Sequence, residues 1–127
     1  MANHPLADFL GGFVAAEGCF TAAGTETKHS FTFAVALGET DAAACELLHD
    51  FFGCGTIHHY ARRKAHYDDE VRFQVRKLRD LIERVVPFMD EHLPASYKRE
   101  QYLVWRTQLL DYWEHEARRP RSTWSAR

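Results

Sequence analysis

The chain of 127 residues is 46% hydrophobic and 13% aromatic, and its formal net charge is −2. This length is enough for one domain with its own hydrophobic core, and the composition excludes an intrinsically disordered chain. No apolar run approaches the roughly 20 residues that a helix needs to cross a bilayer. We therefore expect one globular domain with no membrane partner.

The cysteines and the N-terminus indicate the compartment. Cys19, Cys45 and Cys54 are odd in number and scattered along the chain, which predicts reduced thiols. The N-terminus has neither the basic start nor the small-residue cleavage site of a signal peptide. We expect a cytoplasmic protein, in a bacterium or an organellar matrix, that is not secreted. A zinc site built from these cysteines is an alternative that no CxxC pair supports.

Helix and strand patterns alternate along the chain. In chain order they predict a helix at 5–16, strands at 18–25 and 30–37, a helix from residue 40 or 41 to 52, strands at 56–62 and 70–76, and helices at 78–86 and 96–113. This α-β-β-α-β-β-α-α order predicts an α+β fold. Two hairpins would form a four-stranded antiparallel sheet, with helices covering one face. Residues 1–116 form a single domain, and residues 117–127 form a polar, arginine-rich tail that we expect to be mobile.

Alternation within the strands separates a core face of the sheet from an open face. The apolar positions assigned to the core are Phe31, Phe33, Val35, Val71, Phe73 and Val75. The opposite face carries Thr21, Ser30, Thr32, Ala34, Ala36, His58, Tyr60, Arg62, Arg72, Gln74 and Arg76. Arginine and glutamine are the side chains that pair bidentately with guanine and adenine in the major groove. An ordinary solvated sheet face has the same pattern, so both interpretations stay open.

Positive charge is concentrated near this face. Residues 1–57 contain one basic residue and seven acids, whereas residues 58–79 contain seven basic residues. The local field, rather than the total charge, decides where phosphates bind. The net charge of −2 therefore does not exclude a nucleic acid. Arg63 and Lys64, in the loop after the third strand, are further candidates for DNA contact.

The stretch from residue 9 to residue 20 combines a short apolar helix with a single acid at its end. Glu17 is followed by Gly18 and the first strand, a position poorly suited to core packing and well suited to a divalent cation. Gly11 and Gly12 each cost about 1 kcal/mol of helix stability relative to alanine. Such glycines are explained if another helix approaches their backbone closely. An ordinary amphipathic helix that ends in Glu-Gly is the alternative interpretation.

This stretch resembles the signature of the LAGLIDADG homing endonucleases, in the variant with Glu in place of the last Asp. Gly12 matches the family's helix-contact glycine, and Glu17 matches its metal-binding acid. Segments that resemble later family landmarks, in the same order, are 31–35, 51–57, 86–90 and 93–99. The resemblance implies a saddle-shaped sheet that binds double-stranded DNA. One copy of the signature implies a homodimer, with a contact helix that presents Leu10, Gly11, Gly12, Phe13 and Ala16.

The resemblance also implies a mobile-element nuclease that hydrolyses both strands of a long, near-palindromic site and leaves 3′ overhangs. Glu17 would hold Mg²⁺, with the Gly18 carbonyl as an additional ligand, and Lys98 matches the basic residue near the attacking water. Mn²⁺ or Ca²⁺ can substitute in binding, and no small-molecule cofactor is expected. One acid is too little for a metal site, so two Glu17 side chains from a symmetric pair are needed. A solvated lysine at the start of a helix is the alternative for Lys98.

Ala15 departs from the first acid of the family signature, a position not generally counted as the metal ligand, and two further departures bear on catalysis. Leu37 falls where a polar residue is common, and an acid, Asp41, falls where some members have a basic residue. These departures favour an alternative: a DNA-binding protein that no longer cleaves, either a domesticated regulator or a maturase-like factor that helps intron RNA to fold. A third hypothesis is a protein-interaction module that uses the sheet face. A metal site at His58, His59 and His66 is disfavoured, because adjacent strand residues point to opposite faces.

Large apolar residues recur at helical spacing near the C-terminus. Tyr102, Trp105, Leu109 and Trp113 share this spacing, which predicts core packing rather than base stacking. Trp124 lies in the tail, and its sequence context indicates no role.

Overall fold

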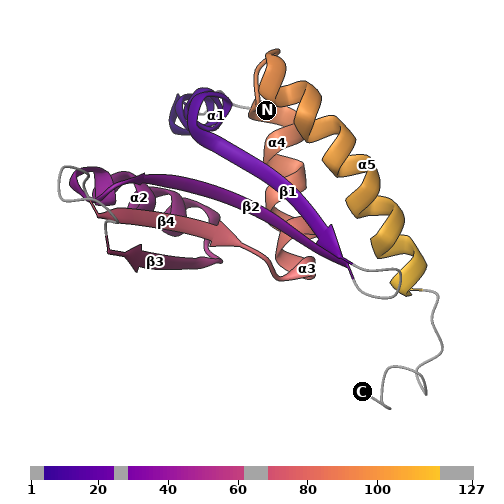
Figure 1. The fold of residues 1–127 in the computed structure, drawn as a ribbon. Helices are drawn as coiled ribbons and strands as arrows, with labels where there is room; N and C mark the ends of the chain where they lie inside the picture. The colour runs from indigo at the N-terminus through magenta and orange to yellow at the C-terminus, as the bar shows by residue number, and fades with distance from the viewer. Residues whose placement is uncertain (1–4, 25–28, 62–68, 118–127) are drawn as a thin grey trace.

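The computed structural model describes residues 5–24, 29–61 and 69–117. In chain order its elements are α1 (Pro5–Glu17), β1 (Gly18–Gly24), β2 (His29–Gly38), the 3₁₀ turn η1 (Glu39–Asp41), α2 (Ala42–Phe52), β3 (Thr56–Tyr60), β4 (Glu70–Val75), α3 (Leu78–Asp80), the π-helical turn η2 (Leu81–Val85), α4 (Val86–His92) and α5 (Tyr97–Ala117). The strands form one antiparallel sheet with helices packed on one side (Figure 1). This arrangement confirms the predicted fold class. Within the described residues no helix is long and apolar enough to cross a membrane.

The sheet has the strand order β1-β2-β4-β3, so the two hairpins join through β2 and β4. Across that junction Phe33 pairs with Val75, and Val35 pairs with Phe73. These four side chains are fully buried, as is Val71, and the sixth predicted core residue, Phe31, is 4% exposed. The predicted alternation of the strands is therefore confirmed.

Helix α2 covers the core face of β2 and β4, and its buried positions Cys45, Leu48 and Phe52 lie at helical spacing. It ends at Gly53, whose φ of 68° lies in the left-handed region that glycine adopts without strain. Asp41, the residue before this helix, makes no side-chain capping hydrogen bond. The chain instead enters α2 through the preceding 3₁₀ turn η1.

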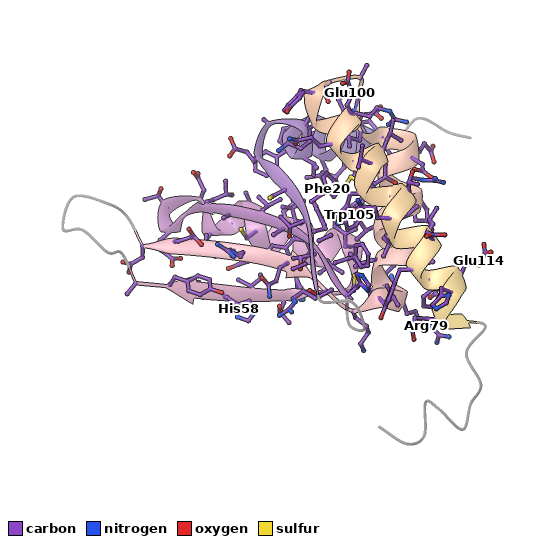
Figure 2. The ribbon with its side chains drawn as sticks, turned by 45° about the vertical axis from the view of Figure 1, so that its right-hand side comes forward. Phe20, His58, Arg79, Glu100, Trp105 and Glu114 are labelled. Carbon is purple, nitrogen blue, oxygen red and sulfur yellow. The ribbon has the colours of Figure 1, made fainter. Side chains whose placement is uncertain are left out.

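Helix α5 runs along β1 and closes the aromatic part of the core (Figures 1 and 2). Phe20 of β1 meets Trp105 and Tyr102, with ring centroids 5.0 and 5.1 Å apart. The Trp105 indole N–H donates to the Thr21 carbonyl at 2.9 Å, which fixes α5 against the edge of the sheet. Tyr102, Trp105 and Leu109 are buried, which confirms their predicted role in the core, whereas the prediction is wrong for Trp113, which is half-buried and lies outside the core.

The helical segment around Pro87 differs from the prediction. The sequence places a helix end before Pro87, whereas the chain continues through α3, η2 and α4 as far as His92. The Val86 N–H bonds to the Leu81 carbonyl five residues back, which is the spacing of a π turn. Pro87 then falls in the first turn of α4, where a proline ring and a missing N–H are tolerated. The π turn therefore absorbs the proline without ending the helical path.

Candidate nucleic-acid interface and metal site

The bend between α1 and β1 exposes the predicted metal-binding acid. A Cβ atom at Gly18 would lie 2.6 Å from Val14 Cγ1 and 2.8 Å from the Val14 carbonyl oxygen, so only glycine fits there. The chain consequently passes from helix to strand without a loop, and Glu17 lies exposed at the bend. Within the part of the chain that the structure describes, the Glu17 carboxylate has no hydrogen bond or ion pair.

Lys98 reaches the same bend from the first turn of α5. Its ammonium donates a hydrogen bond to the Gly18 carbonyl at 2.5 Å, across 80 residues of sequence. Its neighbour Arg99 turns elsewhere and donates to the backbone carbonyls of Met89, Asp90 and Leu93, around the end of α4. The structure thus brings Lys98 to the residue that follows Glu17, and it assigns Arg99 to the support of α4.

The oxygen donors at this bend fit a hard divalent cation in part. A carboxylate and a backbone carbonyl are the oxygen ligands that Mg²⁺ prefers. Among the described residues, no three His, Cys, Asp or Glu side chains lie close enough together to hold a metal ion. A metal ion at this bend would therefore need ligands beyond the His, Cys, Asp and Glu side chains of the described residues. The Gly18 carbonyl also already accepts the Lys98 hydrogen bond.

Helix α1 has one face buried in its own protomer and one exposed apolar face. Phe9 is 61% exposed and stacks on Phe13, with ring centroids 6.3 Å apart. Gly12 lies on the exposed face, where an added Cβ would meet no atom within 4 Å. Leu10, by contrast, is 1% exposed, and a Cβ at Gly11 would lie 2.0 Å from the His92 carbonyl oxygen of α4.

This division corrects the predicted dimer contact. Leu10 and Gly11 cannot lie on a surface offered to another molecule, because the core and α4 of the same protomer already occupy their surroundings. Gly12, Phe13 and Ala16 keep at least part of their surface exposed, so the prediction stays open for these three. The close approach that the glycine pair suggested is therefore intramolecular at Gly11.

The side of the sheet away from the helices carries the predicted DNA-contacting residues. Those that lie on its strands are Thr21, Ser30, Thr32, Ala34, His58, Tyr60, Arg72 and Gln74. Arg76 is exposed directly after β4, which ends at Val75. Figure 2 shows His58 on this side, on the strand β3. Predicted contacts at Arg62, Arg63 and Lys64 lie outside the described residues, as do His66 of the histidine-metal alternative and the C-terminal tail.

The strand register joins these polar residues into rows. One row runs Ala34, Gln74, Thr56, and the next runs Ala36, Arg72, His58. The imidazole Nε2 of His58 lies 2.9 Å from Thr56 Oγ1 and 3.5 Å from Gln74 Nε2. The His58 imidazole therefore lies next to both the Gln74 amide and the Thr56 hydroxyl of the edge strand β3.

Glu70 is a feature of this face that sequence reasoning missed. Its carboxylate oxygen Oε2 accepts a hydrogen bond from Nη2 of Arg72 at 2.9 Å. The guanidinium carbon of Arg72 also lies 5.3 Å from the ring centroid of Tyr60. A spacing of two residues on one strand puts Glu70 and Arg72 on the same face, and that signal was present in the sequence.

Of the departures from the family pattern, Leu37 lies near the bend between α1 and β1, and Asp41 lies beyond the end of β2. Leu37 pairs with Val71 in the sheet and packs against the core. It lies two residues beyond Val35, which pairs with Gly18. Asp41 is exposed at the end of η1. Leu37 thus adds apolar surface, rather than a hydrogen-bonding group, to this part of β2.

The family model described as LAGLIDADG endonuclease matches residues 10–109, which is most of the chain. The chain belongs to the LAGLIDADG endonuclease family. Among curated relatives of this LAGLIDADG protein is the probable intron-encoded endonuclease 2 of Neurospora crassa, which is 28% identical over 99 residues. That match covers 78% of this chain and 21% of the relative. The chain therefore spans about a fifth of the length of the curated relative.

Solved LAGLIDADG structures share the fold. The homing endonuclease I-GzeII, in complex with its DNA target, superposes with a TM-score of 0.76 at 23% identity, covering 98% of this chain and 42% of that one. The homing endonuclease I-TnaI superposes with a TM-score of 0.72 at 27% identity, covering 91% of this chain and 78% of that one. These similarities confirm the predicted family and fold, and DNA is the partner present in the I-GzeII structure.

Proposed function

We propose that two copies of this chain form a homodimeric homing endonuclease that cuts both strands of a long, near-palindromic DNA site. The observation that carries the proposal is the meeting of Lys98 with the bend that presents Glu17. The names of the relatives support it, since one is a probable intron-encoded endonuclease and another is a homing endonuclease in complex with DNA. The protein would be encoded by a mobile element and would act in the cytoplasm or an organellar matrix.

The exposed face of α1 supports the dimer. Phe9 and Phe13 present stacked rings, and Gly12 leaves room for a second backbone. Two α1 helices packed through these residues around a twofold axis would bring their two Glu17 carboxylates together. Each protomer would then place its own open sheet face on one half of the DNA site.

The residues at the bend support Mg²⁺-dependent hydrolysis. Mg²⁺, when bound, activates a water and neutralises charge on the leaving oxygen. The two Glu17 carboxylates would hold it, with the Gly18 carbonyl as a further oxygen donor and the scissile phosphates completing the set. The Lys98 ammonium, held at the Gly18 carbonyl, places a positive charge where negative charge develops on the phosphate. Staggered cuts across the minor groove would leave 3′ overhangs.

A Glu17→Gln variant tests the proposal. Sites cleaved by the wild-type protein in Mg²⁺ are first selected from a randomised DNA library. The variant should then bind a selected site in Ca²⁺ but fail to cut it in Mg²⁺ or Mn²⁺, because a neutral amide holds the cation poorly. Glu46→Gln, at an exposed position on α2, is the matched control and should cut normally. Cleavage by Glu17→Gln at the wild-type rate would overturn the assignment.

A DNA-binding protein that no longer cleaves is the second candidate function. The apolar packing of Leu37 and the exposed acid Asp41 favour it, because neither assists an activated water. Salt-sensitive binding to a selected site, with no nicking of that site by the wild-type protein in Mg²⁺ or Mn²⁺, would establish this alternative. A protein-interaction module would show no salt-sensitive affinity for DNA.

A further inference from the structure

Three side chains on the open face of the sheet form a unit that we call the Arg72 cluster: Glu70, Arg72 and Tyr60. Glu70 and Tyr60 are directly paired residues of β4 and β3, and Arg72 lies two residues further along β4. All three are accessible, with 43% of Tyr60 exposed and 41% and 39% of the Glu70 and Arg72 side chains. The cluster therefore lies where a ligand of this face would contact it.

The guanidinium of Arg72 is held from two sides. Its Nη2 donates to Glu70 Oε2 at 2.9 Å, and its central carbon lies 5.3 Å from the Tyr60 ring centroid, within the range of a cation–π contact. Directly across the sheet, Arg72 has the small residue Ala36 on one side and His58 on the other. Arginine normally loses much rotamer freedom on binding, and this arrangement fixes the side chain in advance.

The same contacts decide which edge of the guanidinium a ligand can use. Nε of Arg72 is buried and has no hydrogen-bond partner in the described part of the chain. Because Nε is enclosed, a ligand cannot use both donors on the Nε–Nη2 side of the fork. The donors that Glu70 leaves free are the two hydrogens of Nη1 and one hydrogen of Nη2. A pair of acceptors can therefore approach Arg72 end-on.

The carboxylate of Glu70 selects between two kinds of acceptor. A DNA phosphate carries a full negative charge, and a carboxylate hydrogen-bonded to the same guanidinium repels it. The guanine edge presents two neutral acceptors, O6 and N7, which match the spacing of two guanidinium donors. Glu70 thus disfavours backbone contact by Arg72 while leaving base contact available.

We infer that Glu70 is a positioning residue that determines specificity, holding Arg72 on Tyr60 so that Arg72 contacts a guanine in the major groove and not a phosphate. This inference rests on the proposed function, since it requires that the open face binds DNA. It extends that function by naming the base that the Arg72 cluster prefers and the acid that enforces the preference.

The test compares Arg72→Ala, Glu70→Ala and Glu70→Gln with the wild-type protein. Bound sites are selected from a randomised duplex library in Ca²⁺, and the salt dependence of binding to a random-sequence duplex is measured separately. Arg72→Ala should abolish one guanine preference per half-site, a loss of about 5- to 150-fold in discrimination. Glu70→Ala frees the arginine and should weaken the same preference by about 2- to 12-fold.

Salt dependence separates positioning from a merely structural role. In Glu70→Ala the freed Arg72 can contact a phosphate, so the log–log salt slope should steepen by about 0.9 and random DNA should bind more tightly. Glu70→Gln keeps a hydrogen-bond acceptor but not the charge. It should retain more of the guanine preference than Glu70→Ala while still binding random DNA more tightly. Glu46→Ala, on the far side of the sheet, controls for loss of one acid.

The outcomes distinguish this inference from the proposed function. If Arg72→Ala changes no base preference, Arg72 does not read a base and the inference is overturned, whereas the proposed function stands as long as the wild-type protein cleaves its selected site. If Arg72→Ala removes a guanine preference and Glu70→Ala leaves it intact, the role of Glu70 is overturned and the proposed function stands. Should Glu70→Ala fail to fold by circular dichroism, Glu70→Gln decides: unchanged affinity for random DNA would contradict the inference.

Discussion

Adjacent glycines on α1 should respond in opposite ways to the same substitution. An alanine at position 11 places a Cβ 2.0 Å from the His92 carbonyl oxygen and 2.7 Å from its carbon, and both atoms belong to the backbone. Neither can move without shifting the end of α4 away from α1. An alanine at position 12 meets nothing within 4 Å. The pair therefore tests the packing of α1 with an internal control.

The size of the effect follows from two terms. Overpacking against a rigid neighbour costs up to about 3 kcal/mol, and replacing a helical glycine by alanine returns about 1 kcal/mol. Gly11→Ala should thus lose about 2 kcal/mol of unfolding free energy, which lowers Tm by roughly 6–12 °C for a domain of this size. Gly12→Ala has only the favourable term and should gain up to about 1 kcal/mol.

Urea and thermal unfolding followed by circular dichroism measure both changes. The unfolding free energy is compared at several protein concentrations, because dissociation of a dimer adds a concentration-dependent term. Sedimentation of the folded proteins then tests the proposed dimer separately, and in that dimer Gly12→Ala should weaken association by separating the two α1 helices. Equal destabilisation by the two substitutions, or a Gly11→Ala variant as stable as the wild type, would refute the assignment of Gly11 to the contact with α4.

Two further predictions concern the core. The single hydroxyl hydrogen of Tyr102 points to Asp90 Oδ1 at 2.6 Å, and the Val86 carbonyl oxygen is an alternative acceptor at 3.1 Å. Burial, followed by the hydrogen bond and charge of Asp90, raises the pKa of Tyr102 well above its usual value. Tyr102 ionises more readily in the unfolded chain, so the wild-type unfolding free energy should fall as pH rises above about 10, and Tyr102→Phe should flatten that fall at a cost of about 1–3 kcal/mol near neutral pH, as measured by urea titrations. Exposed Cys19 should react first with a thiol reagent, whereas burial raises the pKa of the Cys45 thiol and protects it until the protein unfolds. Mass spectrometry of the labelled peptides measures the order of reaction, and rapid labelling of Cys45 in the native protein would contradict this prediction.

The strands were predictable because their signal is local. Phe31, Phe33 and Val35 alternate with small residues, and a period of two has one structural solution when one face is buried. The helical path through Pro87 was not predictable, because a π turn is defined by its hydrogen bonds and has no characteristic residue types. The sequence also does not specify which of the two adjacent glycines faces a neighbouring helix, since that depends on how α1 is rotated about its own axis.

The candidate site divides in the same way. Glu17 stands out as an acid at a helix–strand junction, but Lys98 was connected to it only through the family resemblance. The hydrogen bond to Gly18 joins residues that no periodicity relates. Glu70 was overlooked because, in a count of charges along the sequence, an acidic residue is evidence against DNA binding. Its significance depends on the orientation of Arg72, which the structure supplies.

The alternation of the sheet also bears on how such a protein can change its target over evolutionary time. On β2, Thr32 and Ala34, and on β4, Arg72 and Gln74, each lie between fully or almost fully buried apolar neighbours on the same strand. The groups that hold the domain together and the groups that face outward are thus separate sets of residues sharing one backbone. Mutations can accumulate in the outward set with little penalty in folding. Under the proposed function, a lineage can therefore explore new DNA sites one base at a time while its scaffold stays the same.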